Sequence, residues 1–313
     1  MDRTRFEHDV ETLVGPGRLQ RDAPLAPLTT LHVGGPADWI VEAHTVAELE
    51  AVLAAARGAG VPVALLGGGS NVVVADAGIR GVVIRPRLAG IERTAPDRVR
   101  AEAGLTINGL VRWTISRGLA GLEAWAGTPG TVGGAIYGNA HFGGRNIGDL
   151  VTGLELITPA GARQHAAPSE MEFAYDTSRL RRTREILLSA EFAVTAAAPE
   201  DLRRRARESL AYRKRTQPLA LPSAGCVFQN PDPARDVLPP GMPASAGALV
   251  DRAGLKGHRI GGARISPAHA NFVVNEGGAA ARDVRALVEL ARRAVREQFG
   301  VELRDEVVYL GEF

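Results

Sequence analysis

The sequence predicts an α+β protein of about two domains, and three observations lead to this prediction. The chain has 313 residues, which corresponds to about two domains of ordinary size. Short apolar runs bounded by turn residues, typical of strands, alternate with stretches of helical periodicity. Two runs that are rich in glycine and carry no charge, 67–71 and 127–140, lie between these elements. We therefore expect a mixed fold in which two glycine loops come close to another group.

Composition narrows the class of protein. The chain is 45% hydrophobic and 23% charged, which fits a globular protein with a sizeable core. The net charge of +2 and the lack of a basic, aromatic-rich stretch argue against nucleic-acid binding. A single cysteine, Cys226, excludes an internal disulfide and favours a reducing compartment such as the cytoplasm. The mixed charges of residues 1–9 do not fit a signal peptide, and no apolar run approaches the ~20 residues of a membrane span.

The first part of the chain leads up to the first glycine run. Residues 1–25 lack clear periodicity and are expected to form a loosely held lead-in. A strand at 39–43 precedes Thr45 and Glu48, whose spacing is that of a helix capping box. The apolar face of the helix that follows is made of Leu49, Val52, Leu53 and Ala56, and Gly58 and Gly60 end it. The next elements are a buried strand at 61–66, the first glycine run, and strands at 72–74 and 81–85.

The rest of the chain continues the mixture of strands and helices. Strands are expected at 99–103, 151–158, 186–194 and 301–310. Thr106 can cap a helix that ends at Gly118. A basic helix is expected at 200–215, and its arginines either form a solvated face or pair with phosphates. A long amphipathic helix ends at Gly300 and has on one face Val284, Leu287, Val288, Ala291, Val295 and Phe299.

The two glycine runs favour contact between bare backbone and an anionic ligand. Glycine reaches positive φ easily and allows close approach, and successive backbone N–H groups form concave nests that hold anions. A diphosphate is the obvious ligand of this kind, although tight turns between strands would use the same residues. A P-loop does not fit, because no Gly-Lys-Ser/Thr follows the first run. A Rossmann loop does not fit either, because the next element is expected to be a strand, which offers no helix N-terminus. The runs therefore predict two cradles of the strand-loop-strand kind.

Several motifs together resemble one known family. They are Gly67–Asn71, the segment 118–123 followed by Gly127–Ala140, Pro222–Pro231, His269–Phe272, and Glu306 with Val307. In this order, and over about residues 28–311, they resemble the UDP-N-acetylenolpyruvoylglucosamine reductase (MurB) family. The short spacing between Tyr175 and Phe192 resembles the shorter type of this family, which lacks a tyrosine-bearing insertion.

The resemblance implies a fold, an activity and cofactors. The fold would be the FAD-binding module of the vanillyl-alcohol-oxidase (PCMH) type with a smaller α/β substrate-binding domain. The FAD module would occupy 1–198, as two subdomains at about 26–86 and 87–198, completed by 301–313, and the substrate domain would occupy 199–300. The reaction would be NADPH-dependent, FAD-mediated reduction of UDP-N-acetylglucosamine enolpyruvate to UDP-N-acetylmuramate in peptidoglycan synthesis. FAD would be bound non-covalently, no metal is implied, and we expect a monomer that binds neither nucleic acid nor membrane.

The resemblance also implies catalytic residues. Cys226 stands where the family has a serine that donates a proton to the substrate. A thiol, with an ordinary pKa of about 8.5, is a stronger acid than an alcohol and is still mostly protonated at neutral pH. A lone cysteine is otherwise often a small buried apolar residue. Glu306 matches the family's glutamate that stabilises the enolate, whereas Glu302 and Asp305 are expected to face water.

One departure from the family concerns a catalytic cation. Residues 173–179 correspond to a segment in which the family usually has an arginine directly after a tyrosine. That arginine helps hold the substrate carboxylate or enolate. This chain has Asp176 after Tyr175, and an aspartate cannot replace a cation. Arg179 is the nearest candidate for this catalytic role, and Arg213 is another. His141 stands where the family more often has glycine, and we interpret it as a loop residue.

A second departure concerns the diphosphate. The family's phosphate-binding lysine is replaced by Thr216, so Lys214, Arg213 or Arg215 is expected to contact the diphosphate. The residues implied for FAD binding are Thr30, Gly34, Gly67, Gly68, Gly69, Ser70, Asn71, Gly127, Thr128, Pro129, Gly130, Gly133, Gly134, Ile136 and Asn139. Those implied for substrate binding are Tyr175, Arg213, Lys214, Gln229, Asn230 and Asn271.

Two alternative functions stay open. One is another FAD-dependent oxidoreductase of the same fold that acts on sugars or lactones, although 222–231 and 269–272 resemble only the reductase. The other is a flavin-binding protein that has lost catalysis. The departures from the family at Asp176 and Thr216 suggest this alternative. Substrate-dependent consumption of NADPH distinguishes the three functions.

Overall fold

The computed structural model describes the whole chain, residues 1–313, and these residues form two compact units. Unit 1 consists of Met1–Arg21, Asp38–Gly68 and Gly81–Tyr212, and unit 2 of Asp22–Ala37, Gly69–Arg80 and Arg213–Phe313. Each hydrophobic core is made of residues from one unit alone. Each unit therefore has its own source of stability.

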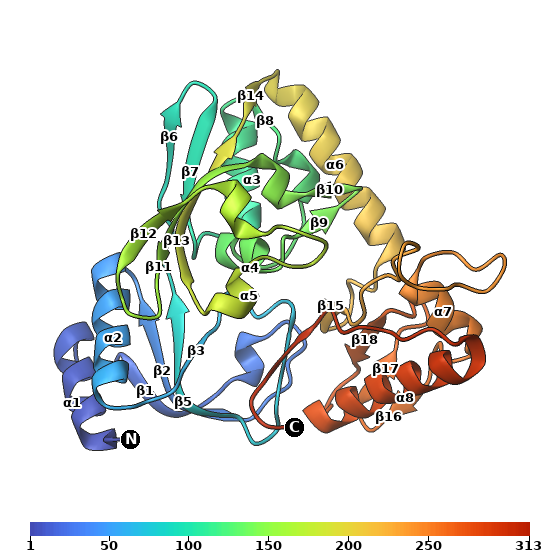
Figure 1. The fold of residues 1–313 in the computed structure, drawn as a ribbon, viewed down its shortest axis with the longest axis horizontal. Helices are drawn as coiled ribbons and strands as arrows, with labels where there is room; N and C mark the ends of the chain where they lie inside the picture. Colours follow the sequence, from blue (N-terminus) through green and yellow to red (C-terminus); the bar gives the residue numbers. More distant parts are fainter. The chain divides into compact units, whose positions relative to one another are not determined.

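The first part of unit 1 is a four-stranded sheet with two helices. The sheet has the order β1-β2-β5-β3, with β1 at Leu19–Pro24, β2 at Pro36–Ala43, β5 at Ile79–Pro86 and β3 at Val63–Leu65. Helices α1 (Arg3–Val14) and α2 (Val46–Gly58) lie side by side (Figure 1), and their apolar residues share a core with the sheet. The predicted capping of α2 is confirmed, because the Thr45 side chain accepts a hydrogen bond from the Glu48 amide.

The expectation of a loosely held lead-in at the N-terminus is wrong. Asp2 caps α1 through its side chain, and β1 follows this helix. The side chains of Phe6, Val10 and Val14, spaced four residues apart, are at most 5% exposed. This single apolar stripe is short and lies among many charges, so the local pattern is weak. Burial against the sheet, rather than helix propensity, stabilises the segment.

The strand predicted at 61–66 is shorter and less buried than expected. β3 is the edge strand of its sheet and pairs in parallel with β5, with Val63 opposite Val82. The side chains of Val63 and Leu65 are 40% and 36% exposed. An apolar run predicts a strand but does not show whether a neighbour covers both of its faces.

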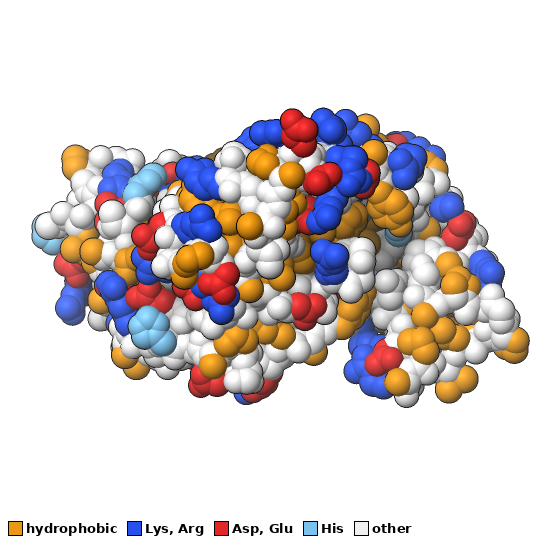
Figure 2. Space-filling view, turned by 90° about the horizontal axis from the view of Figure 1, so that it is seen from above, with side chains coloured by type: hydrophobic (Ala, Val, Ile, Leu, Met, Phe, Trp, Pro, Cys, Tyr) orange, Lys and Arg blue, Asp and Glu red, His pale blue; other side chains and the backbone are white.

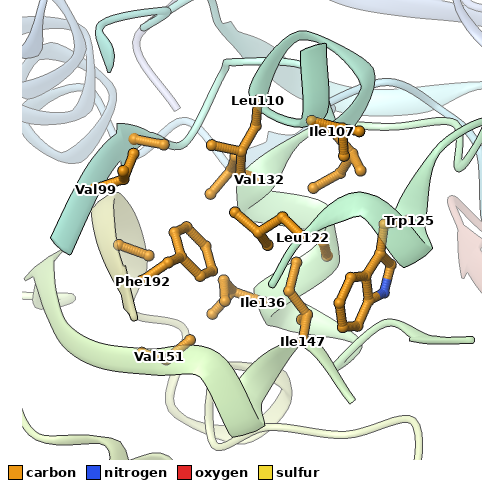
Figure 3. Close-up of a cluster of buried hydrophobic side chains, with 14 of the residues drawn as sticks. Val99, Ile107, Leu110, Leu122, Trp125, Val132, Ile136, Ile147, Val151 and Phe192 are labelled. Atoms are coloured by element: carbon orange, nitrogen blue, oxygen red, sulfur yellow. The ribbon is translucent and has the colours of Figure 1, made fainter. Parts of the chain in front are cut away.

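The second part of unit 1 is a five-stranded antiparallel sheet with the order β12-β11-β13-β7-β6. Its strands are β6 (Ile91–Ala95), β7 (Arg98–Glu102), β11 (Val151–Ile157), β12 (Arg163–Ala166) and β13 (Ile186–Ala193). The strands predicted at 99–103, 151–158 and 186–194 are confirmed. Phe192 is opposite Val151 on one side and Val99 on the other, and Figure 3 shows these side chains in the core.

Shorter elements complete unit 1. Helix α3 (Ile107–Ser116) begins after Thr106, whose side chain accepts from the Gly109 amide as predicted. The others are α4 (Val132–Tyr137), α5 (Leu180–Thr183), the pairs β8 (Leu119–Ala120) with β14 (Thr195–Ala196) and β9 (His141–Phe142) with β10 (Arg145–Asn146), and 3-10 helices at Glu123–Trp125, Ile147–Leu150 and Pro168–Met171. The basic helix α6 spans Pro199–Thr216, which confirms its prediction.

The interpretation of 127–140 as a loop between strands is wrong in its second half. Residues 132–137 form α4, and the Thr131 side chain caps it by accepting from the Gly134 amide. Adjacent glycines disfavour a helix by about 1 kcal/mol each, which is why the sequence favours a loop. Val132 and Ile136, one turn apart, instead bury their side chains in the core shown in Figure 3. Burial of two such side chains outweighs that cost.

Unit 2 is built around an antiparallel sheet with the order β15-β18-β17-β16. The strands are β15 (Ser223–Cys226), β16 (Arg259–Ile260), β17 (Ala263–Ile265) and β18 (Phe272–Asn275), and the helices are α7 (Ala246–Arg252), α8 (Ala281–Phe299) and a 3-10 helix at Ala26–Leu28. Helix α8 confirms the predicted amphipathic helix. Its apolar face is buried at Val284, Leu287, Val288, Ala291 and Val295, and Gly300 ends it with φ of +69°.

The C-terminal strand is shorter than the predicted 301–310. Only β19 (Val308–Leu310) forms a ladder, in parallel with β4 (Val72–Val74). The preceding residues bury alternate side chains, which produces a strand-like pattern, but their backbone makes only an isolated bridge between Asp305 and Phe228. A ladder needs a partner edge along its whole length, and the sequence pattern does not report that edge.

Surface charge is mixed. Figure 2 shows basic and acidic side chains interspersed over the face that it presents. On α6, Arg204 pairs with Asp201 and Glu208 of the same helix, which favours a solvated face for that arginine. No helix is both long enough and apolar enough to span a bilayer.

We expect Phe6→Ala to lower the free energy of unfolding by about 3–5 kcal/mol, because it leaves a cavity at a fully buried ring that lies 5.0 Å from the Trp39 ring. Urea unfolding followed by circular dichroism measures this change. Leu13→Ala on the same helix is the control, because Leu13 is 47% exposed and should cost less than about 1 kcal/mol. Equal effects of the two substitutions would show that α1 does not stabilise unit 1.

Candidate active site

The two glycine runs meet within unit 1. A Cβ added to Gly68 would lie 2.6 Å from the Cα of Gly130, and one added to Gly67 would lie 2.6 Å from the Oγ1 of Thr131. Both distances are too short for real Cβ atoms, so the contact requires glycine at 67 and 68. We call Gly67, Gly68, Gly130 and Thr131 the glycine cradle.

Most backbone amides of the second glycine run are used inside unit 1. The amides that donate to other groups of the unit include those of Gly127, Thr128, Val132, Gly133, Gly134, Ala135, Gly138, Asn139 and Ala140. The amides of Gly130 and Thr131 are not among them. The prediction that 127–139 offers backbone donors to a ligand therefore narrows to the glycine cradle.

Asn108 holds the start of the second run, and sequence reasoning does not single it out. Its Oδ1 accepts a hydrogen bond from the Gly127 amide at 2.7 Å, and its Nδ2 donates to the Thr128 carbonyl at 3.1 Å. The residue lies in the first turn of α3. An asparagine in this position carries no local signal, because its partners lie about twenty residues further along the chain.

Two residues implied for FAD binding direct their side chains into the fold. Ile136 is fully buried and points into the core of Figure 3. Asn139 is 2% exposed, and its side chain donates to the Ala174 carbonyl at 2.8 Å and accepts from the Gly148 amide at 3.0 Å. These side chains position the loop rather than face a ligand. Pro129 and Gly134 are exposed, whereas Gly127, Thr128 and Gly133 are partly exposed.

Tyr175 and Asp176 form the tip of a tight turn. Its flanking residues, Ala174 and Thr177, exchange backbone hydrogen bonds of 3.1 and 3.3 Å. The Tyr175 side chain is 41% exposed, whereas Asp176 is 4% exposed. The Oδ1 of Asp176 lies 2.9 Å from the Nδ1 of His141. Interpreting His141 as a plain loop residue misses this pair, which no spacing in the sequence indicates.

Arg179 is committed to a carboxylate of its own unit. Its Nε and Nη2 donate to the two carboxylate oxygens of Glu185 at 2.9 and 3.0 Å. The side chain is only 14% exposed. A bidentate pair of this kind holds the planar guanidinium firmly. This geometry does not favour the hypothesis that Arg179 is a catalytic cation.

In unit 2, Cys226 and Arg213 interact. Cys226 ends β15 opposite Phe272 of β18, and it is partly exposed. Arg213 is 7% exposed. Burial lowers the pKa of Arg213 to about 10, and attraction to the Cys226 sulfur counteracts part of this shift. With a pKa of about 10 the Arg213 guanidinium stays charged at neutral pH, and it interacts electrostatically with the Cys226 sulfur.

Glu306 lies beside the segment that follows Cys226. Its amide donates to the Val227 carbonyl at 2.9 Å, and its carbonyl accepts from the Asn71 Nδ2 at 3.1 Å. The side chain is partly exposed. Glu306 is thus anchored through its backbone beside Val227, the residue that follows Cys226.

The neighbouring Asp305 does not face water as expected. It forms an ion pair with Arg292, and only 29% of its side chain is exposed. Burial raises the pKa of Asp305, although Arg292 acts in the opposite direction. The exposure of Asp305 is decided by its ion pair with Arg292 of α8. The alternating pattern of charges in the sequence does not show this long-range partner. Glu302 is exposed, as predicted.

The residues of unit 2 implied for FAD binding form a tightly packed backbone cluster. The Thr30 amide donates to the Gly69 carbonyl at 3.0 Å, and the Thr30 hydroxyl donates to the Ser223 carbonyl at 2.7 Å. Gly69 has φ of +62°. At Gly34, with φ of +128°, a Cβ would lie 2.6 Å from the Val74 Cβ. Ser70 is partly exposed.

Of the residues implied for substrate binding, Tyr175 lies in unit 1 and the others lie in unit 2, where two of them support the fold. Asn271 is 2% exposed, and its side chain accepts from the Phe228 amide at 2.9 Å and donates to the Phe228 carbonyl at 2.8 Å. Asn230 Oδ1 accepts from the Ala246 amide at the start of α7. Gln229 is partly exposed, and Lys214 is exposed.

These arrangements define a class of protein. The glycine cradle is uncharged and has no side chain at 67, 68 or 130, which suits close approach of a dinucleotide to the backbone. A thiol, an arginine and a carboxyl group in unit 2 suit proton transfer to a substrate that becomes anionic. A profile described as an FAD binding domain matches residues 37–167. The protein is therefore an FAD-binding oxidoreductase.

Comparison with known proteins shows the particular family. A profile described as the C-terminal domain of UDP-N-acetylenolpyruvoylglucosamine reductase matches residues 217–310. The reductase from Anaeromyxobacter dehalogenans (strain 2CP-1) is 46% identical over 95% of this chain and 87% of its own. The reductase from a Synechococcus species is 40% identical over 95% of this chain and 93% of its own. The crystal structure of the Thermus caldophilus reductase (MurB) matches with a TM-score of 0.78 and 35% identity, covering 94% of this chain and 99% of that one.

The chain belongs to the UDP-N-acetylenolpyruvoylglucosamine reductase family. The predicted fold, an FAD-binding module of the vanillyl-alcohol-oxidase (PCMH) type with a smaller α/β part, is confirmed. FAD as the cofactor is confirmed with it.

We expect Gly68→Ala to lower both the thermal stability and the flavin content, because the new methyl group collides with the backbone of Gly130. The flavin-to-protein absorbance ratio and a melting curve measure the two effects. Gly153→Ala on β11 is the matched control, because a Cβ there meets nothing within 4 Å. A Gly68→Ala protein with full flavin content would show that the glycine cradle does not contact FAD.

Proposed function

We propose that this chain catalyses the NADPH-dependent reduction of UDP-N-acetylglucosamine enolpyruvate to UDP-N-acetylmuramate, in peptidoglycan synthesis in the cytoplasm. A hydride and a proton add across the enolpyruvyl double bond, and NADPH becomes NADP⁺. The family supports the reaction, and the single cysteine supports a reducing compartment. The observation that carries the chemistry is the charged Arg213 beside the Cys226 sulfur.

The glycine cradle is the part of unit 1 that would hold FAD. Its backbone amides suit the diphosphate, and the absence of side chains permits close approach. Gly69, Ser70 and Asn71, which belong to unit 2, continue the first glycine run and are also proposed to bind FAD. Bound FAD supplies the hydride transfer between NADPH and the enolpyruvyl carbon.

Cys226 is the proton donor in this proposal. Hydride addition leaves negative charge on the carbon next to the substrate carboxylate, and that carbon must take a proton. The thiol gives up its proton and becomes a thiolate, which the buried guanidinium of Arg213 stabilises. Because the cysteine is partly exposed, water can reprotonate it before the next turnover.

Glu306 stabilises the enolate in this proposal. Its backbone is held by Val227 and Asn71, so the carboxyl group is presented from a firmly placed residue. A protonated carboxyl that donates a hydrogen bond to the developing oxyanion lowers the barrier without forming a covalent bond. Lys214, exposed in the last turn of α6, is proposed to contact the UDP diphosphate.

We expect the purified wild-type protein to be yellow, to bleach when NADPH is added, and to regain its colour when the enolpyruvyl sugar is added without oxygen. Visible absorbance in an anaerobic cuvette follows both half-reactions. Recovery of colour with oxygen alone would instead indicate an oxidase of sugars or lactones, or a flavin-binding protein that has lost catalysis. Either result would overturn the proposed function.

We expect Cys226→Ala to bleach normally with NADPH but to lose about 10²–10⁴-fold in turnover of the enolpyruvyl sugar, because general acid catalysis is removed. Cys226→Ser is the matched control, because it restores an ionisable O–H group and should keep measurable turnover. Steady-state kinetics and the anaerobic half-reactions separate the two steps. Normal turnover in the alanine variant would contradict the role of Cys226.

We expect Arg213→Met to lower kcat about tenfold or more with unchanged flavin content, because the thiolate loses its nearby cation. Methionine keeps much of the volume of the buried side chain. Arg207→Met is the control, since Arg207 is exposed on the same helix. If Arg213→Met instead raised only the KM for the UDP-sugar, Arg213 would be a diphosphate ligand and not a partner of the thiol.

A further inference from the structure

The His141–Asp176 pair of unit 1 has no part in the chemistry proposed above. The Nδ1 of His141 lies 2.9 Å from the Oδ1 of Asp176. The His141 side chain is 32% exposed, whereas the Asp176 side chain is only 6% exposed. The carboxylate is thus the buried, orienting member of the pair, and the imidazole is the member that a ligand can reach.

The conformation and burial of Asp176 are both energetically unfavourable. The Asp176 backbone has φ of +54°, a left-handed conformation that aspartate and asparagine adopt more readily than most residues. Its second oxygen, Oδ2, is buried and makes no hydrogen bond within the chain. A buried carboxylate with one unsatisfied oxygen is unfavourable unless a charged partner is present. The His141 imidazole is the partner that the fold places beside it.

Two hydrogen bonds attach this turn to the second glycine run. Asn139 donates to the Ala174 carbonyl at 2.8 Å, and the Ser178 hydroxyl donates to the Tyr137 carbonyl at 2.9 Å. His141 follows that run directly, so both members of the pair are held by the same frame. The arrangement is rigid on both sides, which suits a binding group that must keep its direction.

Tyr175 completes the site. Its ring centroid lies 4.8 Å from that of His141, with a tilt of 43° between the planes. The side chain is 41% exposed. An imidazole whose Nδ1 donates to a carboxylate has its Nε2 available for a ligand. The His141 ring therefore offers an Nε2–H donor to an anionic oxygen group, and the Tyr175 ring lies beside it.

We propose that His141, oriented by Asp176 and flanked by Tyr175, binds the carboxylate of the enolpyruvyl group. This inference rests on the proposed function, because that reaction supplies the carboxylate. In this complex the Nδ1–H of His141 donates to Asp176, and the Nε2–H donates to the substrate carboxylate. His141 is a binding residue in this assignment, and Asp176 is a positioning residue that acts through it.

The test compares His141→Leu, His141→Gln and Asp176→Asn with the wild type. Asparagine tolerates the left-handed conformation, so Asp176→Asn preserves the turn even if the histidine variants lose stability. His165→Leu is the control, because His165 is an exposed histidine on β12. Each protein is assayed for flavin content, melting temperature, bleaching by NADPH, kcat, and separate KM values for NADPH and for the enolpyruvyl sugar.

We expect His141→Leu to raise the KM for the enolpyruvyl sugar about tenfold or more, because a charge-assisted hydrogen bond is lost. His141→Gln, which keeps a donor without charge, and Asp176→Asn should produce smaller increases in the same direction. The KM for NADPH and the rate of bleaching should not change, which excludes NADPH as the anion that this site binds.

Two results would overturn the inference. If the variants lost stability but kept the wild-type KM for the enolpyruvyl sugar, the pair would be structural. If the KM for NADPH rose instead, the site would bind the phosphates of that cofactor. Failure of the wild type to regain colour with the enolpyruvyl sugar is a different result, because it overturns the proposed function itself and removes the carboxylate on which the inference depends.

Discussion

The contact between the two glycine runs is the constraint on which the structure of unit 1 depends. Gly68 meets the backbone of Gly130 at a distance that excludes any side chain. The rest of the second run serves to hold this contact, with Asn108 bonded to its start and Asn139 bonded at its end. Helix α4 secures it further, because Val132 and Ile136 are buried in the core. The uncharged surface of the glycine cradle is therefore supported by ordinary packing and side-chain hydrogen bonds.

The main electrostatic feature of unit 2 is the interaction between the Arg213 guanidinium and the Cys226 thiol. Burial works against the charge of Arg213, as the direction of its pKa shift shows, yet the guanidinium remains charged at neutral pH. The same unit ties Glu306 by its backbone beside the segment that follows Cys226. A cysteine that donates its proton leaves a thiolate, and a nearby cation stabilises that negative charge. The Cys226–Arg213 contact is thus consistent with a thiol in this position.

Regular elements with strong periodicity could be predicted from the sequence. Helix α8 and the cap of α2 follow from apolar spacing and from the Thr45 side chain, which are local properties. The errors occur where a long-range neighbour decides the structure. Helix α1 forms because a sheet covers its single apolar stripe. The segment before β19 lacks a strand ladder because it pairs with its neighbour only at the bridge between Asp305 and Phe228. Asp305 forms an ion pair with Arg292, a residue of α8, and is only partly exposed.

The sequence by itself determined the family, the cofactor and the identity of the thiol, because motif order and residue type are written along the chain. Only the tertiary structure decided which charges are available for function. Arg179, near in sequence to the departure at Asp176, is held by Glu185, whereas the more distant Arg213 lies near the thiol. His141 and Asp176 are thirty-five positions apart, yet they form a close pair. Electrostatic interactions act through space between folded segments, so a list of charged residues cannot show which of them meet.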